Sequence, residues 1–376
     1  MKETLTTREI YDRYNFPHFR RCVAIVYNLV ATGKAKRINL RYCEGDWDVL
    51  FQNYGRRGKP PVEYDHWNHD YPKPSIVPVE QLMPPEPVQE EAIEASPITP
   101  PLLEQCGSKG LFLRIFASDW HTAKAFQLDG FNAKYNVDIL KRRVIAYANK
   151  IIAITKDINA PILGVIYHSI GDMMEGDGFV YKGQFWHLEI EDVAEQESVF
   201  ADIESDFLVR VYEGLGRPKM KGKKVAGNHD MRRKESSNMN MAASAHNIVK
   251  RQTPFVEWQY SDDFIVDQED GLITYTSHGR DMGASANVFE TRGRNKALAC
   301  NAQLLVTGHA HKMRNSLFTA MGKDIALYGN GSLCGYDPFA ETKGFVPVPV
   351  GQTILFTEPE LKIIWSEHRI YLGGVK

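Results

Sequence analysis

Cysteine is scarce in this chain of 376 residues, and no two cysteines have the spacing of a metal-binding or redox pair. The five are Cys22, Cys43, Cys106, Cys300 and Cys334. A scattered, odd-numbered set without a Cys-x-x-Cys spacing argues against both a disulfide framework and a structural zinc site. We therefore expect ordinary reduced thiols.

Long apolar runs are absent as well. No run approaches the roughly 20 residues that cross a bilayer, and the N-terminus lacks the basic, apolar and small-residue layout of a signal peptide. With 43% hydrophobic and 24% charged residues, the composition is typical of a soluble globular protein. These features predict a cytoplasmic protein without a membrane partner.

A strong net charge is missing too, but the formal value of −2 hides an uneven distribution. Residues 1–59 hold 12 Lys and Arg against 6 Asp and Glu, whereas residues 60–106 hold 1 against 9. This acidic stretch also contains 11 of the 19 prolines. Proline removes backbone donors and like charges repel, so we predict an extended linker over residues 60–108.

The basic segment 1–59 has the pattern of a small helical domain. Thr6 and Glu9 fit a capping box, a second helical pattern covers residues 18–31, and alternation in KRINLRYC and WDVLF suggests a hairpin. Two helices and a wing-like hairpin resemble a winged helix-turn-helix, which would bind DNA. A protein-contact or dimerisation module with a solvated basic face is the alternative. The basic residues on or near these elements are Arg20, Arg21, Lys34, Lys36, Arg37 and Arg41.

From about residue 109 the chain changes to short apolar runs that each end in polar residues. Continuous β-rich runs are typical of strands buried on both faces, and helical patterns at 137–154 and 196–215 lie between them. We therefore predict an α/β domain over residues 109–376, with polar clusters at the carboxyl edge of its sheets. The runs are LFLRIFASDWH, ILGVIYHSIGD, KKVAGNHD, LITYTSHG, LLVTGHAH and DIALYGNGS.

The polar residues at these strand ends are donors suited to divalent metal ions. They are Asp119, His121, Asp172, Asn228, His229, Asp230, His278, His309 and His311. Carboxylates, imidazoles and an amide oxygen are hard-to-borderline ligands, and together they outnumber the needs of one ion. Two ions roughly 3.5–4 Å apart usually share a bridging carboxylate, and Asp172 is the best candidate for that bridge.

The motifs D-x-H, GD, GNHD, a lone His after a strand, and GHxH follow one another between residues 112 and 311, and YGNGS follows. In this order they resemble the calcineurin-like metallophosphoesterases, including DNA-repair nucleases and bacteriophage-encoded members. The resemblance implies a four-layer αββα sandwich, here preceded by the small helical domain and the linker.

The resemblance also implies the role of each residue. One ion would take Asp119, His121, Asp172 and His311, and the other would take Asp172, Asn228, His278 and His309. A metal-activated hydroxide would attack the phosphorus in line. His229 would serve as the general acid or as a charge stabiliser, with Asp230 as its orienter. Manganese suits such ligands, and iron, zinc or magnesium are alternatives.

Other residues near the motifs have simpler interpretations. Glu175, in Gly171-Asp172-Met173-Met174-Glu175, is expected to pack or to start a helix rather than to bind metal. His168 is expected to be a core histidine, or one that supports a ligand from behind, because strand histidines commonly satisfy a backbone acceptor.

The substrate is less well defined by the sequence. Basic residues in 216–224, in 231–234 and from Arg280 to Lys296 would steer a polyanion, and aromatic residues would stack bases where they are not core. A nuclease acting on DNA is the first hypothesis. A phosphomonoesterase or small-nucleotide hydrolase with a protein-binding N-terminal module is the second, and an inactive DNA-binding factor is the third. The aromatic residues considered are Phe112, Trp120, Phe185, Trp186 and Trp258.

Overall fold

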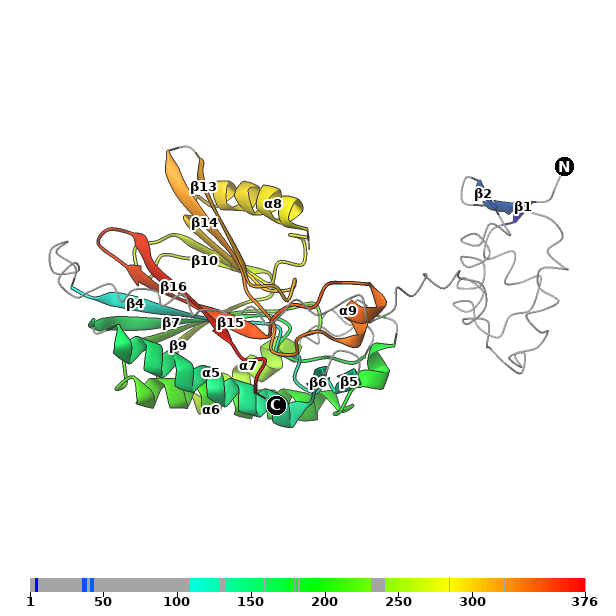
Figure 1. Ribbon diagram of the computed structural model, residues 1–376, viewed down its shortest axis with the longest axis horizontal. Coiled ribbons are helices and arrows are strands. Elements are labelled where there is room, and N and C mark those ends of the chain that lie inside the picture. Colours follow the sequence, from blue (N-terminus) through cyan, green and yellow to red (C-terminus); the bar gives the residue numbers. More distant parts are fainter. Residues whose placement is uncertain are drawn as a thin grey trace, which may run out of the picture. The chain divides into compact units, whose positions relative to one another are not determined.

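The computed structural model (Figure 1) describes three short N-terminal strands and most of the chain from residue 109 onward. The described ranges are 109–128, 133–158, 160–178, 180–181, 183–230, 241–283, 285–320 and 322–375. The chain divides into two compact units, Met1–Ile93 and Glu94–Lys376, and each is described by itself. None of the helices that the structure describes is long and apolar enough to span a bilayer.

In the N-terminal unit the described strands form one antiparallel sheet of order β1-β3-β2. The strands are β1 (Thr4–Leu5), β2 (Lys36–Ile38) and β3 (Arg41–Cys43). β2 and β3 form a hairpin within the KRINLRYC segment. The predicted helices, the WDVLF segment and the linker 60–108 lie outside the described residues, so the winged helix-turn-helix stays a prediction.

The C-terminal unit contains a six-stranded sheet of order β16-β15-β4-β7-β8-β9. Strands β4, β7, β8 and β9 are parallel, with β9 at one edge, whereas β15 and β16 are antiparallel additions at the other edge. Strands β4, β7 and β8 are largely buried along their length, as expected of inner strands of a parallel sheet. The strands are β4 (Leu111–Ala117), β7 (Ile162–Ile170), β8 (Met220–Val225), β9 (Val256–Ser261), β15 (Gly351–Glu358) and β16 (Ile363–Tyr371).

A second, five-stranded sheet has the order β10-β11-β12-β14-β13. Strands β11, β12 and β14 are parallel, and β10 and β13 pair antiparallel at the two edges. A small hairpin joins β5 (Phe126–Leu128) to β6 (Ala133–Tyr135). The sheet strands are β10 (Phe264–Asp267), β11 (Thr274–Ser277), β12 (Leu304–Thr307), β13 (Arg314–Ala320) and β14 (Lys323–Gly329).

The two longest described helices begin at a capping side chain. Asn136 accepts a hydrogen bond from the Ile139 amide at the start of α5 (Val137–Asp157), and Asp192 accepts one from the Glu195 amide at the start of α6 (Val193–Gly214). Such caps satisfy donors that the first helical turn leaves free. The remaining helices are η3 (Gln184–His187), α7 (Met241–Gln252), α8 (Ala286–Ala299) and α9 (Pro338–Thr342).

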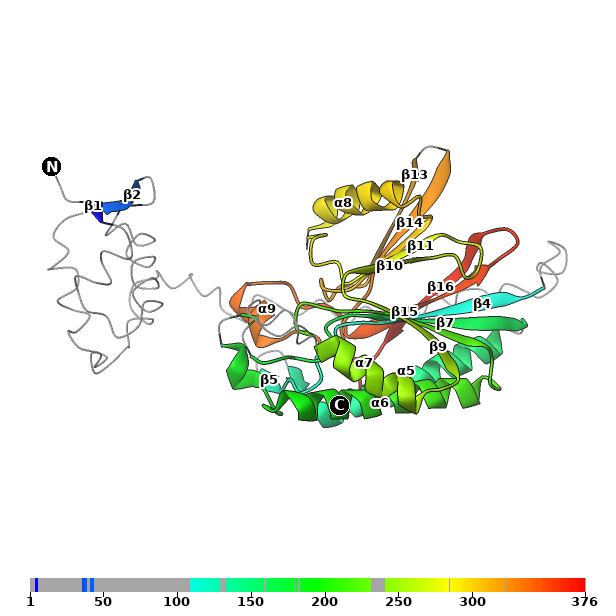
Figure 2. The same cartoon turned by 180° about the vertical axis from the view of Figure 1, so that it is seen from behind.

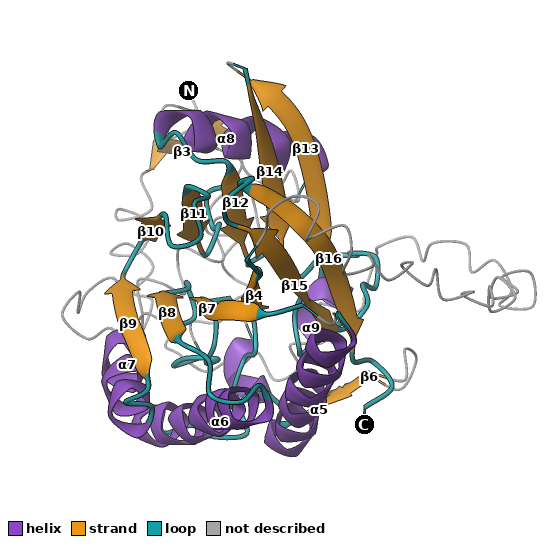
Figure 3. Ribbon diagram, turned by 90° about the vertical axis from the view of Figure 1, so that its left-hand side faces the viewer, coloured by secondary structure: helices purple, strands orange, loops and turns teal. Residues whose placement is uncertain are grey.

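Three apolar clusters hold these elements together. Figures 2 and 3 show the layers of helices and sheets between which they lie. Helices α5, α6 and α7 pack on the outer face of the six-stranded sheet, and α8 packs on the outer face of the second sheet. Between the two sheets lies a third cluster that includes Phe116, Ile170, Val306 and Leu355. The predicted four-layer αββα arrangement is therefore observed.

A charged pair is also buried between the sheets. Arg114 of β4 donates to Asp270 from Nε at 2.7 Å, and both side chains are shielded from solvent. The Arg114 guanidinium also contacts His168, whose other ring nitrogen lies 3.0 Å from Thr276. His168 is thus a core residue, as expected. Burial alone would raise the pKa of Asp270, but Arg114 lowers it below the ordinary carboxyl value.

We expect Asp270→Asn to lower the free energy of unfolding by about 3–5 kcal/mol at neutral pH, because it leaves the Arg114 charge buried without its partner. Since the folded-state pKa of Asp270 is depressed, its contribution is complete above the ordinary carboxyl pKa of about 4. That contribution is lost as the pH falls through the depressed value. The difference between wild type and variant should therefore narrow below about pH 4 in urea titrations.

The matched control is Glu360→Gln. Its partner Lys109 lies 3.4 Å away, but the two side chains are 82% and 44% exposed, so water screens the pair. We expect this substitution to lower the free energy of unfolding by less than about 1 kcal/mol. Equal losses from the two substitutions would contradict the role given to the buried pair.

Candidate metal centre

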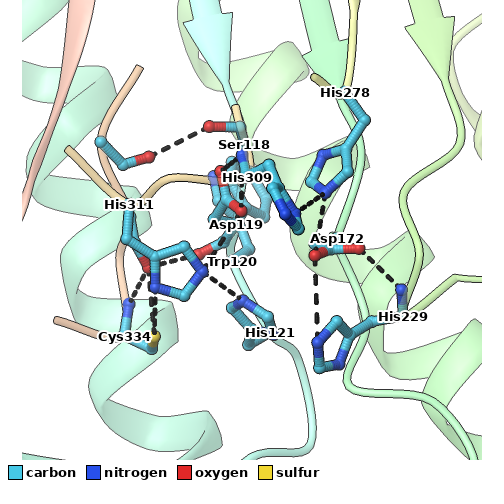
Figure 4. A network of polar contacts seen from close by, with 12 residues as sticks. Ser118, Asp119, Trp120, His121, Asp172, His229, His278, His309, His311 and Cys334 are labelled. Atoms are coloured by element: carbon cyan, nitrogen blue, oxygen red, sulfur yellow. Dashed lines mark hydrogen bonds and ion pairs between the residues drawn. The ribbon is translucent and has the colours of Figure 1, made fainter. Parts of the chain in front are cut away.

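The predicted ligands stand at the carboxyl ends of parallel strands in both sheets. Asp119 and His121 follow β4, Asp172 follows β7, and Asn228 follows β8. From the second sheet, His278 follows β11, and His309 and His311 follow β12. Figure 4 shows that the six labelled ligand side chains converge from both sheets on one region. The structure therefore brings together Asp119, His121, Asp172, His278, His309 and His311, and Asn228 stands just beyond the end of β8.

Sharp backbone turns aim these side chains into the site. Left-handed backbone is uncommon for residues with a side chain and costs roughly 1–3 kcal/mol where the surroundings impose it. Here the surroundings include hydrogen bonds between strand ends, from the Asp119 amide to Gly171 O and from the His121 amide to Asp172 O, both at 3.0 Å. The ligand residues with positive φ are Asp119, His121, Asp172, His309 and His311.

Glycine is required where the strand ends approach most closely. A Cβ on Gly227 would lie 2.1 Å from the backbone nitrogen and from Oδ1 of Asp172. A Cβ on Gly308 would lie 2.6 Å from Oδ2 of Asp119. The glycines of GNHD and GHxH thus leave room for the two carboxylates.

One group of donors is built around Asp119. His121 Nε2 and His311 Nε2 are 3.0 Å apart, and His311 Nε2 lies 3.3 Å from Asp119 Oδ1. The donor atoms of Asp119, His121 and Asp172 all lie within 4.8 Å of one another. This is the spacing of ligands that can share one ion.

A second group is built around Asp172. His278 Nε2 lies 3.0 Å from Asp172 Oδ2 and 3.2 Å from His309 Nδ1. The donors of Asp172, His278 and His309 lie within 4.8 Å of one another. Asp172 belongs to both groups, so the geometry fits two ions that share its carboxylate.

Asn228 provides an independent test of that fit. Its Oδ1 atom is buried and accepts no hydrogen bond from any residue that the structure describes. Burying a carbonyl oxygen without a partner is unfavourable, and a cation would provide the missing interaction. The residues present therefore fit a pair of divalent ions.

The protonation equilibria agree with a site built for cations. Burial lowers the pKa of His121 and of His309 to about 4, so both rings are neutral ligands at neutral pH. Burial disfavours protonation of His278 too, but the Asp172 carboxylate raises its pKa to about 9. His278 can release this proton when a cation compensates the carboxylate charge instead.

His229 lies beside the two groups of metal-ligand atoms, and contacts at its Nδ1 atom hold the ring in place. Its Nδ1 is 2.9 Å from the Gln184 amide nitrogen and 3.1 Å from the Glu175 carbonyl oxygen. Its Nε2 faces Asp172 Oδ2 at 4.0 Å, and its backbone amide donates to Asp172 Oδ1 at 2.7 Å. The ring therefore presents Nε2 to the site, as an acid-base group requires.

Asp230 makes different contacts from those that its predicted role requires. Its carboxylate accepts hydrogen bonds from the amides of Met174 and Gly227, at 3.0 and 2.9 Å. Burial and the neighbouring Asp172 raise its pKa to about 6. In the described part of the chain we find no hydrogen bond from Asp230 to the His229 ring. Through these hydrogen bonds Asp230 links the loop after β7 to the loop after β8. A direct catalytic role for Asp230 stays a prediction.

Glu175 is more closely connected to the site than the sequence suggested. It lies in a non-helical segment and is fully buried, with Oε2 2.7 Å from His121 Nδ1 and 3.6 Å from His229 Nδ1. Burial alone would raise the pKa of Glu175, but Lys124 together with His229 and His121 lowers it far below its usual range. The interpretation as a packing or helix-start residue is wrong: Glu175 holds the ring of one predicted ligand and lies beside His229.

Two further residues near the ligands were not singled out from the sequence. Lys124 Nζ lies 3.5 Å from Glu175 and 2.6 Å from Asp337, so it neutralises buried carboxylates behind the site. Cys334 Sγ lies 4.0 Å from His311 Nδ1. The sequence offered no signal for either, because neither belongs to a motif.

We expect Glu175→Gln to weaken metal binding by roughly 10- to 100-fold, the usual effect of removing a partner that orients a ligand histidine. The amide keeps the shape of the side chain but lacks the charge that holds His121. Isothermal titration calorimetry with manganese measures the change in dissociation constant. Glu191→Gln is the control, because Glu191 is exposed. Unchanged affinity in Glu175→Gln would contradict the positioning role.

Comparisons with known proteins give no family name. No protein-family model and no curated protein matches the chain. Among solved structures, it is similar to Vacuolar Protein Sorting 29 from Cryptosporidium parvum, at 12% identity over 70% of this chain and 99% of that one, with a TM-score of 0.33. It is also similar to a phosphoesterase-like protein of Streptococcus pneumoniae (12% identity, 68% and 97% coverage, TM-score 0.26).

A third similarity is to a dimetal phosphatase from Danio rerio (10% identity, 70% and 99% coverage, TM-score 0.28). Likenesses of this size do not establish a family. The chemistry proposed for the chain therefore depends on the residues of its own site.

Proposed function

We propose that this chain is a metal-dependent phosphoesterase that hydrolyses phosphodiester bonds of nucleic acid. The observation that supports this most is the pair of donor groups that share Asp172, with His229 Nε2 facing the shared carboxylate. One ion would be held by Asp119, His121, Asp172 and His311. The other would be held by Asp172, Asn228, His278 and His309.

Two divalent ions, manganese first among them, would lower the pKa of water and offset charge on the phosphoryl oxygens. The chain's own residues would position the proton donor relative to the leaving oxygen. Contacts at Nδ1 keep the His229 ring in place, so Nε2 can hold a proton for the leaving oxygen. Asp119, His121, Asp172 and His278 are buried, so the fold shields these ligands from bulk water.

The charge that favours nucleic acid comes from fewer residues than the sequence suggested. Lys221 and Lys223 pair with Glu269, and Lys224 pairs with Glu204 at 2.7 Å. These lysines of the 216–224 segment lie on or beside β8 and do not form a free basic loop. Support for a polyanionic substrate therefore rests on the basic N-terminal segment and, among the described residues, on the exposed side chains of Arg280, Arg292 and Arg294 beyond β11.

The test compares four substrates with the purified chain and manganese: an aryl phosphodiester, an aryl phosphomonoester, and single- and double-stranded DNA. We expect hydrolysis of the diesters, and DNA cleavage that falls about 10-fold between 50 and 200 mM salt if two phosphates are contacted. A variant with Arg20, Arg21 and Lys34 changed to alanine should cleave DNA more slowly.

Two other outcomes would refute the proposal. Turnover of the monoester alone, unaffected by the triple variant, would assign the chain to phosphomonoesterases or small-nucleotide hydrolases with a protein-binding N-terminal module. DNA binding without turnover of any of the four substrates would assign it to inactive DNA-binding factors.

A further inference from the structure

Five aromatic side chains near His229 form what we call the aromatic platform: Tyr181, Phe185, Trp186, Phe339 and Phe345. Trp186 is 81% exposed, Phe345 is 51% exposed and Phe185 is 41% exposed. Trp120, by contrast, is fully buried in the core. Large aromatic side chains that gather at the surface are typical of binding sites.

The platform is continuous with the candidate metal centre. The Tyr181 ring centroid is 6.0 Å from that of His229 and 4.9 Å from that of Phe339, and Phe339 is 6.2 Å from Phe345. These separations are within the range of interacting rings. A line of rings thus leads from the predicted acid to the surface.

A second connection runs through Gln184. Its amide contacts His229 Nδ1, and the next two residues along η3 are Phe185 and Trp186. Their ring centroids are 5.7 Å apart. The turn that positions His229 therefore also presents Trp186, the most exposed side chain of the platform.

Buried polar contacts hold both segments of the platform in place. Gln184 accepts a hydrogen bond from the Val180 amide at 2.7 Å and donates one to the Glu175 carbonyl at 2.7 Å. Lys124 binds Asp337, which caps the start of α9 (Figure 1) by accepting from the Ala340 amide at 2.8 Å. A surface fixed in this way loses little conformational entropy when a ligand binds.

An exposed cation beside the platform suits an anionic, aromatic ligand: Lys343 Nζ lies 5.7 Å from the Phe339 ring centroid. Bases in a single strand expose their π-faces, whereas those in a duplex are stacked on one another. His229 is placed for the leaving oxygen, so a ligand on the adjoining rings belongs to the leaving side of the scissile bond.

We propose that the aromatic platform binds nucleobases of a single-stranded nucleic acid on the leaving-group side. This inference rests on the proposed phosphodiesterase function and specifies its substrate as single-stranded. Stacking on Trp186 and Phe185 would provide affinity without sequence preference.

Binding of two labelled hexanucleotides to the full chain, in EDTA so that no cleavage occurs, tests the proposal. One is oligothymidine, and the other is an abasic oligomer with the same phosphates. We expect the wild type to bind oligothymidine more tightly than the abasic oligomer. Trp186→Ala should weaken oligothymidine binding by roughly 5- to 150-fold and leave abasic binding unchanged. Trp186→Phe should stay closer to wild type than to Trp186→Ala.

The control is Phe264→Ala on β10, because Phe264 is 47% exposed but lies outside the platform. Equal affinity for the two oligomers, or an equal effect of the control, would overturn the proposal. The proposal would also be overturned if Trp186→Ala changed the number of protein chains that associate but left the affinity for oligothymidine unchanged. Because binding is measured without turnover, failure to hydrolyse diesters would refute the proposed function separately.

Discussion

Replacing Asp172 with asparagine is expected to reduce bound metal from two ions per chain to one or fewer and to lower activity by more than roughly 100-fold. Removing a residue that only orients a metal ligand lowers metal affinity or activity by up to about 100-fold. Asp172 belongs directly to both donor groups, so its loss should have a larger effect. A neutral amide cannot bridge two cations as a carboxylate does. Elemental analysis after manganese loading, together with diester hydrolysis, measures both effects.

The substitution is suited to this question because it should leave the fold intact. The Oδ1 atom of an asparagine can still accept the hydrogen bond that the His229 amide donates to Asp172 at 2.7 Å. Without metal the thermal midpoint should fall, because His278 loses the carboxylate 3.0 Å away that stabilises its proton, but the chain should still unfold in one cooperative transition. Asp177→Asn is the matched control, since it changes a partly exposed carboxylate in the same loop. Full occupancy of both ions in Asp172→Asn would refute the shared position.

His229→Ala is expected to separate proton transfer from metal binding. The ring contacts Asp172 only at 4.0 Å, and neither donor group needs it, so both ions should remain. Loss of an acid-base group typically lowers the rate by about 100- to 10,000-fold. The loss should be largest for substrates with a poorly acidic leaving group, such as DNA, and smaller for an aryl diester whose leaving oxygen needs no proton.

The control for this variant is His368→Ala. His368 is half-buried on β16, where it packs edge-on against Phe356, away from the strand ends that form the site. We expect it to keep both metal and activity. If His229→Ala slowed aryl and DNA substrates equally while keeping both ions, the role as acid for the leaving oxygen would be contradicted.

The positions of the strand ends could be predicted from the sequence because the signal there is local. A strand buried on both faces is a continuous apolar run, and the residue after it stands at the edge of the sheet. Parallel strands then bring Asp119, Asp172 and His229 to one edge, although more than fifty residues separate each from the next. The alternation of strands and helices predicted an α/β domain, whereas the four αββα layers were implied only by the resemblance to the calcineurin-like metallophosphoesterases.

The contacts that each side chain makes could not be predicted in this way, because they depend on the direction in which the backbone turns. Whether Glu175 faces solvent or His121 depends on the turn after Asp172, whose left-handed backbone the residue type does not reveal. The same holds for Asp230, whose carboxylate contacts backbone amides instead of the neighbouring ring. Adjacent positions in a motif therefore do not establish adjacent functional atoms.

By itself, the sequence of this chain determined which residues can serve as metal ligands and at which strand ends they stand, because both depend on residue type and on short apolar runs. Only the tertiary structure decided which charges remain free and which are paired. Lys124 meets Asp337 across 213 positions and Arg114 meets Asp270 across 156, and Lys224 is neutralised by Glu204 from a helix. Burial makes an unpaired charge too costly to keep, so partners come from wherever packing brings a carboxylate within reach.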